Sequence, residues 1–301
     1  MKQLTIIFLL AWVSVTFAGN ENEDKTGMAF LKVGVDARAA GMGEAYAAAT
    51  NDAYATFWNP AGLLSATQSN VVLMHNRWLF DVNSEFGAVQ FRKQKSSFAF
   101  HVYSFNVGAI EVRNIPSTDP LEETSAHYAS LGFSYARQLG NTLDVGVTVK
   151  YLYEKIFIHS AGGYGLDLGV NYRGLGQNLL LAAALQNLGS MGELDREATA
   201  LPALLRAGGR YQFANPVGPL ELLVAGDAVL PFEENLRVHL GLEAGLWQQL
   251  MLRAGYMNGY ESRNVSFGIG VRKSAFHFDY SYTPFSDDLG SGQRFSLFLA
   301  I

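Results

Sequence analysis

The sequence contains no cysteine, few charged residues and no long apolar run beyond its first residues. The absence of cysteine excludes disulfides, thiolate metal sites, a cysteine nucleophile and a lipidated N-terminal cysteine. Charged residues make up 16% of the chain, against about 25% in soluble domains. The net charge of −5 gives no reason to expect a nucleic-acid partner. After residue 18 no apolar run approaches the roughly 20 residues of a membrane helix, so the mature chain is either secreted and soluble or a β-barrel.

The first 18 residues predict a secretory signal peptide. Lys2 supplies a positive start, residues 4–15 are apolar, and Thr16, Phe17 and Ala18 form a plausible cleavage site. The alternative is a membrane anchor, for which the apolar run is too short. A polar, acidic lead-in follows over residues 20–27.

Apolar and polar residues alternate with a period of two over most of the chain after residue 70. In residues 142–154, Val145, Val147 and Val149 share one face, while Asp144 and Lys150 share the other. This period is that of a half-buried β-strand. Segments of about 9–11 residues suit tilted membrane strands.

We predict fourteen strands, and an even number is typical of bacterial single-chain barrels. They lie near residues 70–78, 84–93, 96–115, 126–139, 142–156, 163–173, 178–187, 201–213, 219–229, 236–247, 249–257, 264–272, 274–283 and 293–301. The third is long, and its register flips near Val102 and Tyr103, which predicts a bulge there.

The connections between these strands alternate between short and long. Gaps at 94–95, 140–141, 215–216, 248 and 273 are short, whereas those at 116–125, 157–162, 188–200, 258–263 and 284–292 are longer. Outer-membrane barrels have short periplasmic turns and longer external loops. The fold class predicted is therefore all-β, a transmembrane antiparallel β-barrel of about 14 strands, with both chain ends in the periplasm.

Residues 30–64 lack alternation and are broken by Gly41, Gly43 and Pro60. Asp52 can cap a short helix over residues 53–58, and Asn59 can cap a second turn with Pro60 in its first position. Residues 45–49 could be extended or helical. We predict an N-terminal plug segment with short helices at 19–66 and a barrel at 67–301, after the signal peptide at 1–18.

The stretch from residue 30 to residue 64 resembles the N-terminal signature of the PorV/PorQ family of outer-membrane proteins, within the wider FadL-like β-barrel superfamily. Two residues depart from the family pattern: Glu44, where the family usually repeats Gly, and Asn51, where it usually has a second Asp. The matching residues are Phe30, Leu31, Gly34, Ala37, Arg38, Ala39, Ala40, Gly41, Met42, Gly43, Ala45, Asp52, Ala53, Trp58, Asn59, Pro60, Ala61, Gly62 and Leu63.

From this resemblance we expect export to the outer membrane of a Gram-negative, Bacteroidota-like bacterium. The candidate plug motif taken from it comprises Arg38, Gly41, Gly43, Asp52, Asn59 and Pro60.

The faces predicted to point into the barrel carry charges of both signs. These charges can pair across the lumen and against the plug, or they can line a solute pathway. Leu180, Ala182 and Ala184 form an apolar inward strip that could pack on the plug or bind a hydrophobic solute.

No motif for catalysis or cofactor binding is present, so we expect no enzyme, no cofactor and no metal. Gly41-Met42-Gly43 continues to Tyr46, where a dinucleotide fingerprint needs a third small residue. The six His residues are scattered without metal-ligand spacing. Spacing alone does not exclude a site assembled from distant strands.

Three functions remain open at this point. The resemblance implies a role in type IX protein secretion or cargo handling, with secretion subunits or secreted proteins bound by loops 116–125, 188–200 and 284–292. The alternative is a FadL-like transporter of hydrophobic small molecules, in which Asn59, Pro60 and Ala61 form either a pivot for the plug or only a cap and turn. A soluble secreted β-protein is the third. The first two also imply outer-membrane lipid as a partner.

Overall fold

The computed structural model describes residues 27–80, 82–112, 121–195, 197–213 and 220–301. The predicted signal peptide and most of the acidic lead-in lie outside the described residues. The predicted turn at 215–216 and the first half of the loop at 116–125 lie outside them too.

Fourteen strands form a closed antiparallel barrel, which confirms the predicted fold class. Each strand pairs with its neighbours in sequence, and β16 closes the barrel on β1, with Leu73 opposite Leu297. The strands are β1 (Asn70–Arg77), β2 (Asn83–Arg92), β3 (Ser96–Val112), β4 (Glu122–Leu139), β5 (Leu143–Ile156), β6 (His159–Tyr172), β7 (Leu179–Met191), β10 (Leu204–Gln212), β11 (Leu220–Pro231), β12 (Arg237–Leu246), β13 (Leu250–Asn258), β14 (Val265–Lys273), β15 (Phe276–Pro284) and β16 (Ser291–Ala300). Two short strands, β8 (Glu193–Leu194) and β9 (Glu197–Ala198), pair with each other between β7 and β10.

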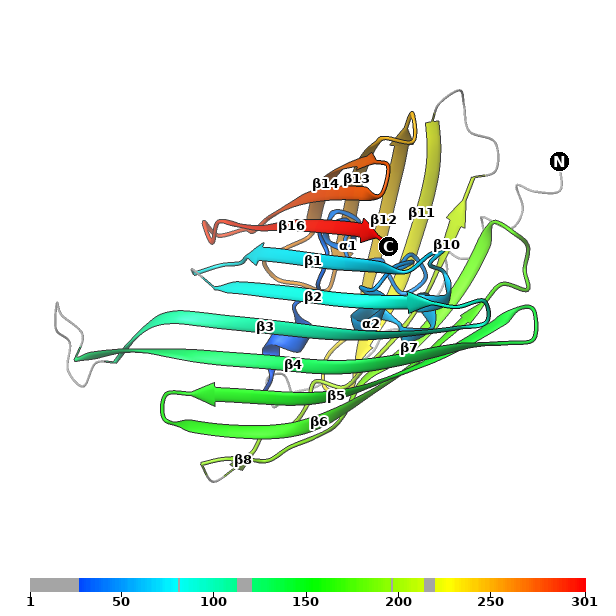
Figure 1. Cartoon of the computed structure of the whole chain (residues 1–301). Coiled ribbons are helices and arrows are strands. Elements are labelled where there is room, and N and C mark those ends of the chain that lie inside the picture. The colour runs from blue at the N-terminus through cyan, green and yellow to red at the C-terminus, as the bar shows by residue number, and fades with distance from the viewer. Residues whose placement is uncertain (1–26, 81, 113–120, 196, 214–219) are drawn as a thin grey trace.

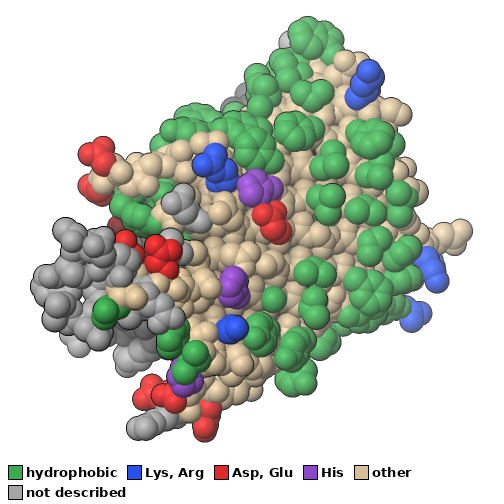
Figure 2. Space-filling view, turned by 60° about the vertical axis from the view of Figure 1, so that its left-hand side comes forward, with side chains coloured by type: hydrophobic (Ala, Val, Ile, Leu, Met, Phe, Trp, Pro, Cys, Tyr) green, Lys and Arg blue, Asp and Glu red, His purple; other side chains and the backbone are tan. Residues whose placement is uncertain are grey.

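The alternation read from the sequence separates the two faces of the wall. In β5, Asp144 and Lys150 are buried, while Val149 and Tyr151 are 51% and 43% exposed. Hydrophobic side chains are spread over the outside of the barrel (Figure 2). A closed barrel pairs its strand backbone internally, as a lipid environment requires, and an apolar outer band is what lipid contacts.

Three predictions about the register and the length of the strands were wrong. The irregularity in β3 lies between Val107 and Ile110, not near Val102. Tyr103 and Phe105 are aromatic residues that point inward and contact Phe30. Their apolar character made the strand look as if its apolar side changed from one face to the other at this point.

The other two errors concern strands that continue into predicted loops. β5 and β6 are joined by Phe157 and Ile158 alone, so most of the loop expected at 157–162 belongs to β6. β7 likewise continues to Met191, which shortens the loop expected at 188–200. Gly162 and Gly189, which fall in these two predicted loops, are strand residues.

The two ends of the barrel can be named by their connections. The long-loop end carries the β3–β4, β7–β10 and β15–β16 connections, and the short-turn end carries the β2–β3, β4–β5 and β12–β13 turns. The C-terminus lies at the short-turn end, where the Ile301 amide donates to the Ser69 carbonyl. This agrees with the predicted periplasmic C-terminus, whereas the N-terminus lies outside the described residues.

Residues 27–69, called the luminal segment here, run through the inside of the barrel (Figure 1). The segment starts at the long-loop end, where the Gly27 amide donates to the Ala200 carbonyl, and it reaches the short-turn end at Ser69. Its helices are η2 (Ala29–Lys32), α1 (Ala37–Gly41), α2 (Ala55–Trp58) and η3 (Pro60–Leu64). Residues 45–49 are irregular and form turns, neither helix nor strand. Among the described residues no helix has the length and apolarity to cross a membrane.

Candidate functional site at the interface of the luminal segment and the wall

Arg38, the predicted motif residue in α1, is ion-paired to the barrel wall. The Asp36 side chain caps α1 by accepting from the Arg38 amide at 3.0 Å. The Arg38 guanidinium binds Glu243 of β12 through two nitrogens, at 2.7 and 2.8 Å. Glu243 also accepts from Arg253 at 2.6 Å, and Arg253 donates to Asp279 at 2.6 Å. A chain of buried charges thus joins the luminal segment to β12, β13 and β15.

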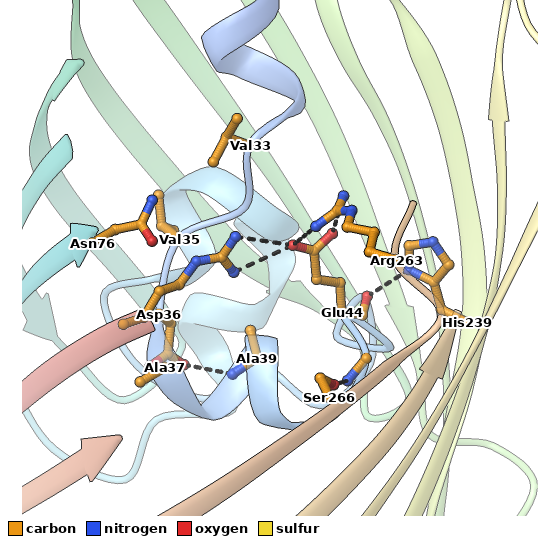
Figure 3. Close-up of polar contacts among 12 residues, drawn as sticks. Val33, Val35, Asp36, Ala37, Ala39, Glu44, Asn76, His239, Arg263 and Ser266 are labelled. Carbon is orange, nitrogen blue, oxygen red and sulfur yellow. Dashed lines mark hydrogen bonds and ion pairs between the residues drawn. The ribbon is translucent and has the colours of Figure 1, made fainter. Parts of the chain in front are cut away.

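Glu44 is the second anchor and lies nearer the long-loop end. Its carboxylate is 3.3 Å from Arg263 and 3.2 Å from Arg294, and Figure 3 shows it facing Arg263. Its backbone carbonyl accepts from Arg206 at 3.0 Å and lies 3.3 Å from a His239 ring nitrogen. Although burial opposes ionisation, the surrounding cations lower the pKa of Glu44 to about 2. The carboxylate is therefore ionised at neutral pH.

The backbone of Glu44 explains why glycine is expected at this position. Its φ is 58°, in the left-handed region that glycine adopts without steric cost. Both residues that depart from the family pattern make polar contacts. Glu44 pairs with Arg263 and Arg294, and the Asn51 side chain accepts from Arg38 at 2.8 Å.

Arg263 also belongs to a stack of cations and aromatic rings at the long-loop end. Its guanidinium lies 5.3 Å from the Trp78 ring and 4.3 Å from the Tyr260 ring. Arg237 covers Tyr260 at 4.4 Å and pairs with Glu234. These contacts join loops from three hairpins to the anchor at Glu44.

Gly41 and Gly43 allow the luminal segment to touch the backbone of the wall. A Cβ on Gly41 would lie 2.9 Å from the Gly268 Cα, and one on Gly43 would lie 3.0 Å from the Gly255 Cα. Gly43 also has a φ of 62°. Facing glycines on the two surfaces therefore set this close approach.

Asn59 and Pro60 form a corner against β5 and β6. The Asn59 side chain accepts from the Ala61 amide at 3.1 Å and donates to the Asn171 side chain at 2.8 Å. Pro60 is the first residue of η3, as the sequence predicts. Wall glycines make room for the corner, since a Cβ on Gly146 would lie 2.4 Å from the Pro60 carbonyl carbon.

Asp52 lies beside Asp36 in a polar cavity of about 130 Å³ between the luminal segment and β15–β16. Its side chain accepts from the Tyr54 amide at 2.9 Å, and α2 begins at Ala55, two residues later than predicted. Burial, and next the neighbouring Asp36, raise the pKa of Asp52 to about 7. Burial and then Asp279 raise the pKa of Asp36 to about 6.

The sequence-derived motif thus splits into three contacts with the wall. Arg38 and Asp52 lie along one cavity, Gly41 and Gly43 lie on β13–β14, and Asn59 with Pro60 lies on β5–β6.

Sequence reasoning missed the anchoring role of Glu44 and did not select Arg263 or Arg294. The presence of Glu at position 44, where the family usually has Gly, was the sequence feature that could have indicated this anchor.

For two features of the lumen, the structure shows the first of the alternatives that the sequence left open. The inward charges pair with one another and with the luminal segment, as in Lys150–Asp167 at 2.8 Å and Arg206–Asp227 at 3.5 Å. The apolar strip of β7 packs on the luminal segment, where Leu180 and Ala182 cluster with Ala47 and Ala48. Within the described part of the chain, no group of three or more His, Asp or Glu side chains is placed to hold a metal ion.

A family model described as "Type IX secretion system protein PorV" matches residues 18–174. The chain belongs to the PorV family. The matched region includes the luminal segment and strands β1–β6. A comparison with curated proteins finds no match.

Three solved structures share the fold of this PorV-family chain. The toluene transporter TbuX of Ralstonia pickettii is 14% identical, with a TM-score of 0.57 over 89% of this chain and 97% of that one. The monoaromatic hydrocarbon channel CymD gives a TM-score of 0.62 at 14% identity, over 89% and 98% of the two chains. A mutant of the monoaromatic hydrocarbon channel TodX gives a TM-score of 0.58 at 14% identity, over 88% of this chain and 97% of that one. At this identity the likeness shows the fold alone, a closed β-barrel.

Proposed function

We propose that this protein is an outer-membrane component of type IX secretion whose barrel is held shut by the luminal segment. The observation that carries the proposal is the match to the PorV family, together with a lumen crossed by buried ion pairs. The long-loop end then supplies the surface that binds secreted proteins or secretion subunits. The protein acts as a binding partner in this role and not as an enzyme.

The filled lumen favours a closed scaffold over an open hydrocarbon channel. The cavity beside Trp58 at the long-loop end measures only about 30 Å³, whereas a cavity known to bind benzene measures about 150 Å³. The cavity of about 130 Å³ is lined by Asp36, Arg38 and Asp52, which disfavour an apolar guest. Opening the lumen would also break the Arg38–Glu243 pair, and breaking a buried pair costs about 3–5 kcal/mol.

The proposed organisation has a signal peptide at 1–18, a plug at 19–66 and a barrel at 67–301. The signal peptide directs export in a Bacteroidota-like bacterium, and the plug motif of Arg38, Gly41, Gly43, Asp52, Asn59 and Pro60 seats the luminal segment in the wall. Outer-membrane lipid surrounds the barrel.

Native mass spectrometry of the protein purified in detergent from its own membrane, without crosslinking, tests this proposal. We expect complexes with secreted proteins or secretion subunits. A monomer that carries only a lipid-sized or hydrocarbon-sized adduct would contradict the secretion role.

The second candidate is transport of hydrophobic small molecules. The fold shared with a toluene transporter and with hydrocarbon channels favours it. Transport would require the luminal segment to move, and the Asn59–Pro60 corner is the position where the chain turns. Uptake of a labelled monoaromatic hydrocarbon by cells with and without the protein tests this candidate, and equal uptake would exclude it.

A further inference from the structure

A wide cavity opens at the short-turn end, beneath the end of η3. Its volume is about 850 Å³, and it is distinct from the two anchors described above. We call it the basic vestibule; it is lined by residues 64–67 of the luminal segment and by Arg92, Lys93, Gln94, Arg173 and Arg210. Four cationic residues and no carboxylate are in this lining, and the Lys93 ammonium lies over the Phe98 ring at 5.6 Å from its centroid.

Most of this positive charge has no ion pair. The Arg92 guanidinium donates to the backbone carbonyls of Ala66 and Ser96, at 3.0 and 3.1 Å, and Asp144 attracts it without an ion pair. Among the described residues no hydrogen bond or ion pair reaches the Arg210 guanidinium, which Glu243 attracts from further away. Of these cations only Arg173 has an ion pair within the described part of the chain, with Asp144 at 2.5 Å.

Polar side chains complete the lining of the vestibule. Thr67 supplies a hydroxyl and Gln94 an amide. Ser65 lines both the vestibule and the cavity of about 130 Å³, and its buried hydroxyl has no hydrogen-bond partner within the described part of the chain.

We propose that the basic vestibule binds an acidic peptide segment of a periplasmic protein. The cations come from β2 and its following turn, from the end of β6 and from β10, so they lie on separate parts of the wall around a wide space. A single small anion does not span such an arrangement, whereas a peptide with several carboxylates presents one to each cation. Guanidinium–carboxylate contacts are strong and specific because they are charge-assisted and bidentate.

The side of the membrane follows from the connections. Short turns are periplasmic in outer-membrane barrels, so the vestibule faces the periplasm. The luminal segment closes its inner end, so the ligand docks at this mouth and does not pass through. Binding of a ligand at this mouth depends only on this orientation of the barrel, so it is compatible with a role in secretion and with a role in transport.

The test is fluorescence anisotropy of the full chain in detergent with a labelled hexaglutamate peptide. We expect binding that weakens as salt rises, because ions screen exposed charges. Arg210→Gln should raise Kd by about tenfold or more, the effect of losing one hydrogen bond to a charged group. The matched control is Lys273→Gln, which removes the same charge from the same end of the barrel, at the end of β14 and outside the vestibule. Its Kd should stay within about twofold of the parent value.

Four results would overturn the proposal. The first three are no binding of hexaglutamate, a loss of binding in Lys273→Gln equal to that in Arg210→Gln, and displacement of the peptide by inorganic phosphate at equal molar concentration. The last result would indicate a site for small anions instead. A labelled hexaglutamine peptide that binds equally well would also contradict the role of charge.

Discussion

Replacement of Glu44 tests whether one buried carboxylate holds the luminal segment to the wall. Its carboxylate lies between Arg263 and Arg294, and all three side chains are almost fully buried. Glu44→Ala would leave the guanidinium groups without this partner. Breaking a buried ion pair from one side costs about 3–5 kcal/mol.

A glycine at the same position separates the charge from the backbone. The φ of Glu44 is 58°, and a non-glycine residue in the left-handed region costs about 1–2 kcal/mol. Glu44→Gly also loses the carboxylate but removes this strain. We therefore expect Glu44→Gly to destabilise the segment by about 1 kcal/mol less than Glu44→Ala.

Hydrogen exchange of the luminal segment, measured by mass spectrometry in detergent, reports its local opening free energy. A loss of about 3 kcal/mol corresponds to exchange about a hundredfold faster or more in Glu44→Ala. Glu85→Gln serves as the control, because Glu85 is 53% exposed in an outward-facing pair with His75. Unchanged exchange in Glu44→Ala would refute the anchor, and faster exchange in Glu44→Gly than in Glu44→Ala would refute the strain argument.

Three other variants test the rest of the interface. Because burial and Asp36 raise the pKa of Asp52 from 3.8 to about 7, its ionisation opposes the fold, and protection of the segment should fall as pH rises from about 4 to about 7. Asp52→Asn should reduce this fall in protection, as measured by hydrogen exchange. A pH profile that is the same in the variant and in the parent protein would contradict the role of Asp52. Gly146→Ala, whose Cβ would meet the Pro60 backbone at 2.4 Å, should lower stability by about 1–3 kcal/mol in thermal unfolding, whereas Gly108→Ala, which meets nothing within 4 Å, should not. Gly27→Cys combined with Thr199→Cys would place the two Cβ atoms 3.4 Å apart, so a disulfide should form on oxidation and be detected by non-reducing peptide mapping. A pair of free thiols would contradict the placement of the start of the luminal segment. Transport that is lost only in the oxidised protein would favour a plug that moves.

Part of the candidate site was also accessible from the sequence. The cap at Asn59 and Pro60 is local, since a side chain bonds an amide two residues away, and the structure has it as predicted. The glycines at 41 and 43 marked a close approach, but no local pattern indicated that Gly268 and Gly255 lie opposite them. Their partners come from the far end of the chain.

The errors have a common physical cause. Tyr103 and Phe105 look like lipid-facing residues, yet they are inward because Phe30 needs apolar neighbours inside the barrel. Glycines in β6 and β7 look like loop residues, yet they are strand because long neighbouring strands supply their pairing. Tertiary contacts override a local preference in each case.

The approximate positions of the barrel strands, their even number, their antiparallel order and the non-strand segment before them could be read from the sequence. These follow from a period of two and from the alternation of short and long gaps, which are local properties of the chain. Which charges meet depends on the three-dimensional fold, because Arg38 binds Glu243 across 205 residues of sequence and Glu44 reaches Arg294 across 250. Closure of the barrel brings these residues together, and no local pattern specifies which inward charge a luminal residue will face.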